Sequence, residues 1–206
     1  MSTPHRPGRP FTLDALRVLE DRLMEYGGPE DDPEKRPGYD QAAVSVILRQ
    51  RPEPELLLVK RAASESDPWS GHMALPGGRR DPTDPSLLHT AIRETREETG
   101  IVLDPTHNRL GRLQVVAPHS RRIPQVDISP FVFALPPEVK AKVNCSEIAE
   151  IFWVPVSHLL APETRGVLRL PMGDAHLRYP AFEVEGEMVW GLTYRILLLL
   201  LESVPD

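Results

Sequence analysis

Residues 78–101 read GRRDPTDPSLLHTAIRETREETGI, and the charge pattern of this stretch decides the fold and the chemistry that the sequence predicts. On a helix, Glu94, Glu97 and Glu98 stand at positions i, i+3 and i+4 and therefore share one face within a single turn. Like charges at this spacing destabilise a helix by roughly 0.2 to 0.5 kcal/mol per pair, so a bound cation would relieve them. Oxygen ligands favour hard cations, which indicates Mg²⁺ or Mn²⁺. An isolated triplet of this kind is more often a solvated helix face, so the neighbouring residues decide the interpretation.

Both ends of the expected helix are marked in the sequence. Asp84 followed by Pro85 predicts an N-cap and a first helical residue, and Gly100 predicts the C-terminal stop. A stripe with the 3.6-residue period is expected to face the core; it consists of Leu88, Ala91, Ile92, Thr95 and Thr99. We therefore expect packing and chemistry to occupy different faces of this helix.

The segment Leu75-Pro76-Gly77-Gly78 lies just upstream, and its two glycines permit a tight turn that can offer the Gly78 carbonyl to a metal ion. With this turn, the stretch resembles the signature of the Nudix hydrolases, G-x5-E-x7-R-E-U-x-E-E-x-G-U, where U is a bulky apolar residue. The part that carries the metal ligands is intact and comprises Arg93, Glu94, Glu97, Glu98, Gly100 and Ile101.

The match departs from the signature in ways that resemble one branch of the family. Asp84 stands at the first glutamate, one extra residue separates it from Arg93, and Thr95 replaces an apolar residue. In the coenzyme A pyrophosphatase branch, G-G-x-x-D-x-x-D-x-S-L precedes the catalytic helix; here the pattern is reproduced by Gly77, Gly78, Asp81, Asp84, Ser86 and Leu87. Further similarity to this branch runs through residues 42–48, 150–155 (EIFWVP) and 189–195 (VWGLTYR).

One motif of that branch is altered. Enzymes that act on coenzyme A usually carry L-L-T-x-R-S-x3-R-x3-G-x3-F-P-G-G before the signature. The corresponding segment here, Lys60 to Gly71, keeps Arg61 but lacks the threonine and the second arginine. The resemblance therefore implies the reaction more firmly than it implies the substrate.

The resemblance implies an α/β fold, a Nudix-type α/β/α sandwich with a mixed β-sheet. It also implies that Glu94, Glu97 and Glu98 bind Mg²⁺, with Mn²⁺ as a substitute and the Gly78 carbonyl as a fourth ligand. Arg93 would have an orienting role, although it could be an ordinary surface ion pair with Glu97. Glu94 or Glu97 would act as the base. Glu147 matches a glutamate frequent in this branch and would be a further ligand or base, unless it is a solvated loop residue.

Several other residues have open roles. Arg121 and Arg122 could clamp phosphate or be free surface residues. His72 and His119 lack partners at metal-ligand spacing, so we expect neither to be catalytic. Among the tryptophans, Trp69 is equally suited to stack a base or to cover the core, whereas Trp153 and Trp190 lie in apolar runs and are expected in the core.

The chain divides into an N-terminal arm, residues 1–38, and a Nudix domain, residues 39–206. A helix over residues 12–26, with Leu13, Leu16, Leu23 and Met24 on one face, is followed by a proline-rich linker; this arm could pack on its own domain or on a second subunit. Within the domain we expect a hairpin of residues 42–48 and 55–60, a strand pair of 113–118 and 126–135, a strand over 150–154 and a helix over 193–203.

Composition excludes several classes of protein. The 206 residues are 40% hydrophobic, enough for a sizeable core, and the single cysteine, Cys145, excludes an internal disulfide framework and suits the cytoplasm. The N-terminus lacks an apolar signal region, and the longest apolar run, residues 196–201, is too short to span a membrane. A net charge of −6 argues against nucleic acid as a partner. A homodimer is left open.

The predicted function is a Mg²⁺- or Mn²⁺-dependent pyrophosphohydrolase that cleaves the diphosphate linkage of a nucleoside diphosphate derivative, with coenzyme A-like compounds as the leading substrates. The alternative substrates are ADP-ribose or other sugar nucleotides and nucleoside triphosphates. Two other classes stay open. An isomerase of the isopentenyl diphosphate type would need Cys145 as a catalytic residue, and a non-catalytic Nudix module that senses a ligand would generally lack some of the glutamates.

Overall fold

The computed structural model describes residues 13–26, 32–65, 69–118, 124–172 and 175–203. Seven strands form the larger sheet: β1 (Asp40–Arg49), β2 (Glu55–Arg61), β3 (Met73–Ala74), β4 (Gly77–Arg79), β5 (Arg109–Arg112), β6 (Val126–Leu135) and β7 (Ile148–Pro155). Its main path is β3-β2-β1-β6-β5, while β4 pairs with β1 and β7 pairs with β2. The pair β1–β6 is parallel and the other pairs are antiparallel, which confirms the expected mixed sheet.

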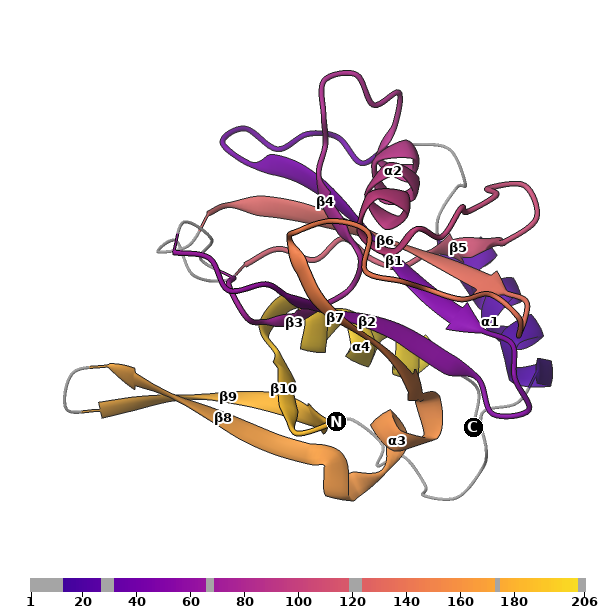
Figure 1. The fold of residues 1–206 in the computed structure, drawn as a ribbon. Helices are drawn as coiled ribbons and strands as arrows, with labels where there is room; N and C mark the ends of the chain where they lie inside the picture. Colours follow the sequence, from indigo (N-terminus) through magenta and orange to yellow (C-terminus); the bar gives the residue numbers. More distant parts are fainter. Residues whose placement is uncertain (1–12, 27–31, 66–68, 119–123, 173–174, 204–206) are drawn as a thin grey trace.

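Helices cover both faces of this sheet, as Figure 1 shows with α2 above it and α4 below it. The helices are α1 (Leu13–Tyr26), α2 (Leu87–Thr99), α3 (Val156–Leu160) and α4 (Gly191–Ser203), with a short 3₁₀ turn at Pro162–Thr164. Because side chains alternate along a strand, β1 contributes Ala43 and Ile47 to the core under α2, and Val46 and Leu48 to the core on the opposite face. The expected α/β/α sandwich is confirmed.

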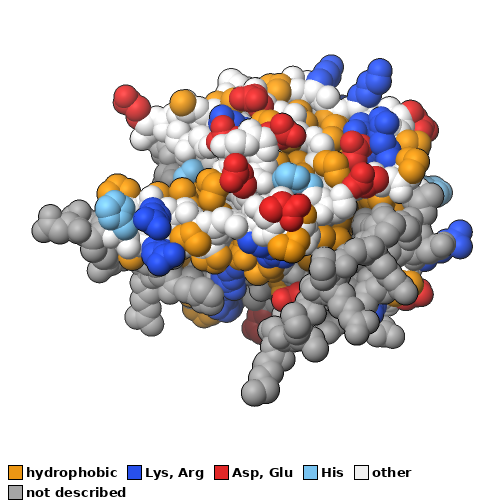
Figure 2. Space-filling model, turned by 90° about the horizontal axis from the view of Figure 1, so that it is seen from below, with side chains coloured by type: hydrophobic (Ala, Val, Ile, Leu, Met, Phe, Trp, Pro, Cys, Tyr) orange, Lys and Arg blue, Asp and Glu red, His pale blue; other side chains and the backbone are white. Residues whose placement is uncertain are grey.

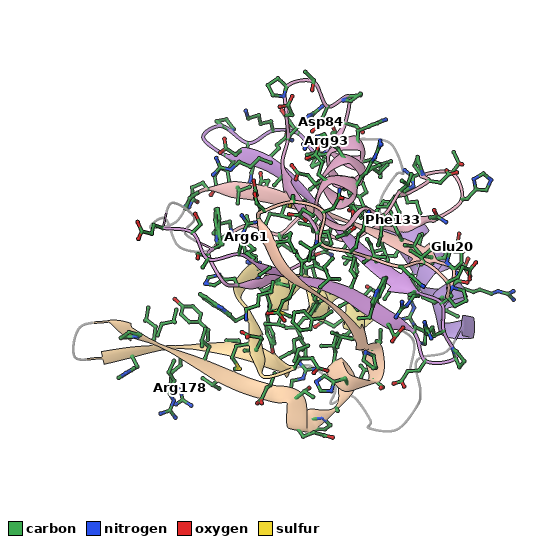
Figure 3. The ribbon with its side chains drawn as sticks, in the orientation of Figure 1. Glu20, Arg61, Asp84, Arg93, Phe133 and Arg178 are labelled. Atoms are coloured by element: carbon green, nitrogen blue, oxygen red, sulfur yellow. The ribbon has the colours of Figure 1, made fainter. Side chains whose placement is uncertain are left out.

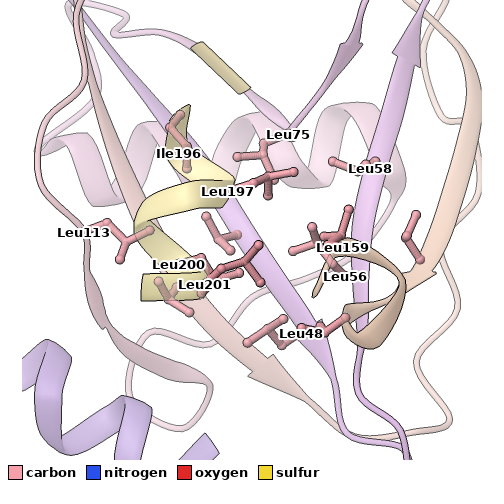
Figure 4. Packing of buried hydrophobic residues seen from close by; sticks show 14 of the residues in the cluster. Leu48, Leu56, Leu58, Leu75, Leu113, Leu159, Ile196, Leu197, Leu200 and Leu201 are labelled. Carbon is pink, nitrogen blue, oxygen red and sulfur yellow. The ribbon is translucent and has the colours of Figure 1, made fainter. Parts of the chain in front are cut away.

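The larger core lies between the sheet and α4. Leucines of β1 and β2 pack there against Leu197, Leu200 and Leu201 of α4, and Figure 4 shows their side chains converging. Helix α1 adds Leu16, Leu19 and Leu23 to the same cluster. Leu23 lies so close to Gly111 of β5 that a Cβ on this glycine would stand 2.6 Å from the Leu23 Cβ.

The N-terminal arm therefore packs on its own sheet, which is one of the two placements left open by the sequence. The side chains of Leu13 and Met24, and residues 27–31 of the linker, lie outside the described part of the chain. Arg36, in the described part of the linker, forms an ion pair with the buried carboxylate of Asp127 at the start of β6. This contact fixes the linker where it enters the domain.

The hairpin β1–β2, strand β7 and helix α4 confirm three of the expected segments, with bounds that differ by a few residues. The strand expected over residues 113–118 is wrong. The strand that pairs with β6 is β5, and the chain beyond it contacts β6 by a single bridge, Val116 to Ile128. Pro130 of β6 has no N–H to donate, which interrupts the ladder between β5 and this bridge.

The sequence reasoning missed a second sheet, formed by β8 (Arg165–Met172), β9 (Ala175–Val184) and β10 (Glu187–Trp190) in the order β10-β9-β8. Figure 1 shows the β8–β9 hairpin projecting from the body of the molecule below β3. Strand β10 leads directly into α4 and contacts β3 at the edge of the larger sheet. No helix within the described residues is long and apolar enough to cross a membrane.

Candidate active site

Helix α2 begins two residues later than the sequence predicts. Its N-cap is Ser86, whose Oγ accepts a hydrogen bond from the backbone N–H of His89 at 3.3 Å, so the expected cap at Asp84 is wrong. Gly100 ends the helix in the left-handed conformation, with φ 69°, as expected. Asp84 does not cap the helix because its carboxylate accepts hydrogen bonds from Arg93 instead.

Asp84 is a buried carboxylate that anchors Arg93. Arg93 Nε and Nη2 donate to its two oxygens at 3.0 and 2.9 Å, and Thr90 Oγ1 and the backbone N–H of Asp81 add bonds of 2.9 and 3.0 Å. The hydrogen bonds from Arg93 are the main cause that lowers the pKa of Asp84 to about 2. Asp84 therefore holds Arg93 in place as a fixed ion-pair partner.

Arg93 extends from Asp84 to two of the glutamates. Its Nη1 donates to Glu94 Oε1 at 2.9 Å and to Glu97 Oε2 at 3.1 Å. The pKa of Arg93 is raised, chiefly by its hydrogen bonds with Asp84. The expected contact with Glu97 is present, but it is one of several in a network, so an isolated surface ion pair does not describe Arg93.

Glu98 is the most buried of the three glutamates, with 4% of its surface exposed. Its Oε2 accepts a hydrogen bond from the backbone N–H of Gly77 at 3.0 Å. Burial is the main cause that raises the pKa of Glu98 to about 8; Glu94 and Glu147 raise it further, while Arg61 lowers it. The expectation that packing and chemistry occupy different faces is wrong for this residue, because Glu98 lies within the buried side of α2.

Glu94 lies against Gly78. A Cβ on Gly78 would stand 2.5 Å from Glu94 Oε1, so a side chain there would displace this carboxylate. Gly77 is more strictly required, because its φ is 151° and a Cβ there would stand 2.3 Å from the Ala43 carbonyl oxygen of β1. Burial raises the pKa of Glu94 as well. The tight turn expected at Gly77 and Gly78 is wrong, because these residues form β4 and pair with β1; as a strand they bring their backbone to two glutamates of α2.

The buried stripe of α2 is held by hydroxyl groups as well as apolar contacts. Thr95 Oγ1 donates to Ser45 Oγ of β1 at 2.8 Å, and Ser45 Oγ donates to the carbonyl of Ala91 at 3.2 Å. Both hydroxyls are fully buried. Thr95 stands where the signature has an apolar residue, and its hydroxyl bonds to Ser45 of the sheet. This hydrogen bond joins α2 to β1.

Glu147 lies beside this site, just before β7. The backbone N–H of Ala62 donates to its carbonyl at 2.8 Å, and Arg61 Nη2 stands 3.8 Å from its carboxylate. The side chain is 72% exposed, and its charge contributes to the raised pKa of both Glu94 and Glu98. Arg61 is a residue that the sequence reasoning did not include in the site, although it matches the first arginine of the coenzyme A motif.

The donor set fits a hard divalent cation. The buried Glu98 and the half-buried Glu94, whose pKa values are raised, together with the exposed Glu97 and Glu147, concentrate carboxylates next to β4. Within the described ranges, no three His, Cys, Asp or Glu side chains converge closely enough to hold a metal ion as they stand. Arg93 engages one oxygen of Glu94 and one of Glu97, so these carboxylates would bind a cation through their second oxygens while Arg93 holds them in place.

The structure also places the weaker candidates. Trp190 is half-exposed at the edge of the sheet and contacts His72, so its expected place in the core is wrong. Trp153 is half-buried beneath the guanidinium of Arg49, 4.1 Å from its ring centroid. Trp69 is half-exposed. His119, Arg121 and Arg122 lie outside the described residues.

Fold and site together define a Nudix hydrolase domain. The family model of the NUDIX domain matches residues 40–171, and the chain belongs to this family. The likeness to solved structures concerns the fold: a MutT/nudix family protein from Enterococcus faecalis aligns over 90% of this chain and 71% of its own length, with a TM-score of 0.53 and 17% identity.

Relatives support the branch resemblance. The chain is 36% identical over 155 residues to the human protein named mitochondrial coenzyme A diphosphatase NUDT8, covering 74% of this chain. It is 39% identical over 189 residues, 82% of this chain, to an uncharacterized protein of Schizosaccharomyces pombe. The chain spans 64% of the length of the human protein and 57% of that of the yeast protein.

Proposed function

We propose that the chain is a Mg²⁺- or Mn²⁺-dependent pyrophosphohydrolase that cleaves the diphosphate linkage of a nucleoside diphosphate derivative. The observation that carries this proposal is the pair of glutamates packed against β4: the buried Glu98 accepts from the Gly77 N–H, and the half-buried Glu94 fills the space that a side chain at Gly78 would take. Withdrawing two neighbouring carboxylates from water is costly without a cation. Nudix hydrolases generally use divalent metal ions, which agrees with this donor set.

The residues that would hold the metal are Glu94, Glu97 and Glu98, with the Gly78 carbonyl as a further ligand. When bound, divalent ions supply neutralisation of the diphosphate oxygens and lower the pKa of a coordinated water. Arg93 is a positioning residue: anchored by Asp84, it holds Glu94 and Glu97 on the same side of α2 while they bind the cation.

Glu147 is our choice for the residue that accepts a proton from the attacking water. Its side chain is mostly exposed, so it has room to reach a water molecule, and its position beside Arg61 brings it close to the pair of glutamates at β4. Glu94 or Glu97 would take this role if Glu147 instead binds metal. The proposed mechanism gives roles to four glutamates and to Arg93, and none to Cys145. An isomerase of the isopentenyl diphosphate type would need Cys145 as a catalytic residue.

Coenzyme A-like compounds are the leading substrates. The likeness to the human coenzyme A diphosphatase favours them. The altered segment Lys60 to Gly71 lacks one arginine of the coenzyme A motif, and a lost hydrogen bond to a charged group is worth roughly 1.5 to 3 kcal/mol. We therefore expect cleavage of coenzyme A that is measurable but inefficient, with ADP-ribose-like sugar nucleotides and nucleoside triphosphates as competitors.

A substrate panel tests this function. Coenzyme A, ADP-ribose and a nucleoside triphosphate are incubated with the protein and Mg²⁺ or Mn²⁺, and the products are identified by mass. We expect 4′-phosphopantetheine and an adenosine bisphosphate from coenzyme A. Binding without cleavage of any compound would instead favour a non-catalytic module, and cleavage of the others but not of coenzyme A would contradict the substrate while retaining the chemistry.

A further inference from the structure

Three aromatic side chains meet where the second sheet contacts the edge of the larger one. The ring centroid of Trp190, the last residue of β10, lies 4.8 Å from that of His72 and 5.2 Å from that of Tyr179 in β9. All three side chains are half-exposed, so part of each ring is open to solvent. We call Tyr179, Trp190 and His72 the aromatic cluster.

The cluster continues into one face of the β8–β9 hairpin. Leu168 lies opposite Tyr179 and Leu170 opposite Leu177, so apolar side chains share the face with Tyr179. On the other face Arg169 lies opposite Arg178, which points away from the body of the molecule in Figure 3. Figure 2, seen from below, shows basic side chains beside hydrophobic ones on the hairpin. The arginines therefore lie on the face opposite the aromatic cluster. That face also carries Val167 and Pro180, whereas the face of Tyr179 carries leucines.

Arg61 connects the aromatic cluster to the candidate active site. Its backbone N–H donates to the carbonyl of His72 at 3.0 Å, while its side chain stands 3.8 Å from Glu147 and its charge lowers the pKa of Glu98. His72 also precedes Gly77 by five residues, which can span at most about 17 Å. One residue, Arg61, therefore contacts the aromatic cluster through its backbone and the glutamate site through its side chain.

An ion pair fixes the aromatic cluster in this position. Lys60 Nζ donates to Glu187 Oε1 of β10 at 2.6 Å and also lies 3.8 Å from Glu150 of β7. Lys60 therefore ties β10 to the end of β2, immediately before Arg61. Strand β10, which ends at Trp190, is thereby joined to the larger sheet before any ligand binds.

We propose that Tyr179 and Trp190 form a subsite that stacks the nucleobase of the substrate. The inference rests on the proposed function, since it assumes a nucleoside diphosphate derivative at the glutamate site. Aromatic rings favour a planar heterocycle over the flexible, polar groups on the other side of a diphosphate, and they accept different bases because every base has a π-face. The subsite would therefore orient the nucleotide with limited selectivity for its base.

Binding of two products tests the subsite by calorimetry. AMP carries the base and ribose 5-phosphate lacks it. We expect Tyr179→Leu and Trp190→Leu to raise the Kd of AMP by about 5- to 160-fold, the range given by stacking of one base on an aromatic ring, and to leave the Kd of ribose 5-phosphate unchanged. Trp153→Leu is the matched control, because it removes a half-buried tryptophan paired with Arg49 at the opposite end of β2 and β7.

Fluorescence keeps the test valid if a leucine variant fails to fold. AMP should quench tryptophan emission in the wild-type protein and in Trp153→Phe, and the quenching should be lost in Trp190→Phe, which retains a ring. Equal weakening of AMP and ribose 5-phosphate, quenching that persists in Trp190→Phe, or no binding of AMP by the wild-type protein would each overturn the subsite.

These readouts separate the two proposals. If the wild-type protein hydrolyses compounds of the panel but all variants bind AMP equally well, the proposed function is supported and the subsite is wrong. If the wild-type protein cleaves nothing but Tyr179→Leu selectively weakens AMP binding, the subsite is supported as a ligand site and the hydrolase mechanism is wrong.

Discussion

Replacing Asp84 by asparagine removes the anchor of Arg93 without changing the size of the side chain. The asparagine oxygen can still accept from Thr90, Asp81 and Arg93 Nη2 at the position of Oδ2, but its NH₂ group would face Arg93 Nε, which now donates to Oδ1 at 3.0 Å, and the negative charge beside the guanidinium is lost. Hydrogen bonds to charged groups contribute roughly 1.5 to 3 kcal/mol each, and some of this is regained from water. Lowering the pKa of Asp84 from 3.8 to about 2 corresponds to roughly 2 kcal/mol of stability. The pKa shift and the hydrogen-bond energies therefore give similar magnitudes.

We therefore expect Asp84→Asn to lower the free energy of unfolding by about 2 kcal/mol at pH 7, measured by denaturant titration. The pKa of Asp84 is depressed in the folded protein, so its contribution is complete above pH 3.8 and is lost as the pH falls toward about 2. The difference between wild type and variant should accordingly shrink over this range of pH. Because Arg93 also positions Glu94 and Glu97, kcat is expected to fall about tenfold or more.

Asp104→Asn serves as the control for this experiment. Its carboxylate also accepts hydrogen bonds, from Thr106 and His107, which lower its pKa, but it lies exposed and contacts neither Arg93 nor the glutamates. This variant should retain wild-type kcat. If Asp84→Asn matches the control in both stability and kcat, the role assigned to Asp84 is wrong.

Further predictions concern the glutamates and the substrate. Glu97→Gln and Glu98→Gln should each lower kcat at saturating Mg²⁺ at least about a hundredfold, or roughly 2.7 kcal/mol of barrier; near-native rates in both would remove these residues from the mechanism. In the metal-free protein, the free energy of unfolding should decline as the pH rises from 4.5 through about 8, because the raised pKa of Glu98 means that the folded state favours its protonated form. Thermal unfolding measures this decline, and Glu98→Gln should lack it. Glu147→Gln should lower kcat more than it raises the Mg²⁺ activation constant, and an unchanged kcat would leave Glu147 a solvated residue. The kcat/KM of coenzyme A should exceed that of its competitors by less than about a hundredfold, and a larger preference would show that the altered motif was overinterpreted.

The sequence predicted those parts of the fold whose signals are local. The apolar period and Gly100 specify α2, and the β-rich runs specify β1, β2 and β7. The start of α2 was wrong because Asp84 and Ser86 are both good caps, and the choice between them depends on Arg93, a full two turns away. The strand after Arg112 was misplaced because pairing is decided on the partner strand, by Pro130.

The site could be predicted in its ligands but not in its environment. Spacing places Glu94, Glu97 and Glu98 on one arc, but only the packing of α2 on β4 makes Glu98 buried and Glu97 exposed. Arg61 reaches Glu147 from the end of β2, and Trp190 reaches His72 from the end of β10, across long distances in sequence. Contacts of this kind follow from sheet topology, and no local pattern specifies them.

The central claim is that the glutamates of α2 use a divalent ion to cleave a diphosphate. The most direct test measures the products of coenzyme A by mass in three reactions: wild type with Mg²⁺, wild type after chelation, and Glu98→Gln with Mg²⁺. We predict 4′-phosphopantetheine and adenosine bisphosphate in the first reaction, at a rate that chelation abolishes, Mg²⁺ restores and Glu98→Gln lowers at least about a hundredfold. The same products at undiminished rate after chelation, or in Glu98→Gln, would contradict the account.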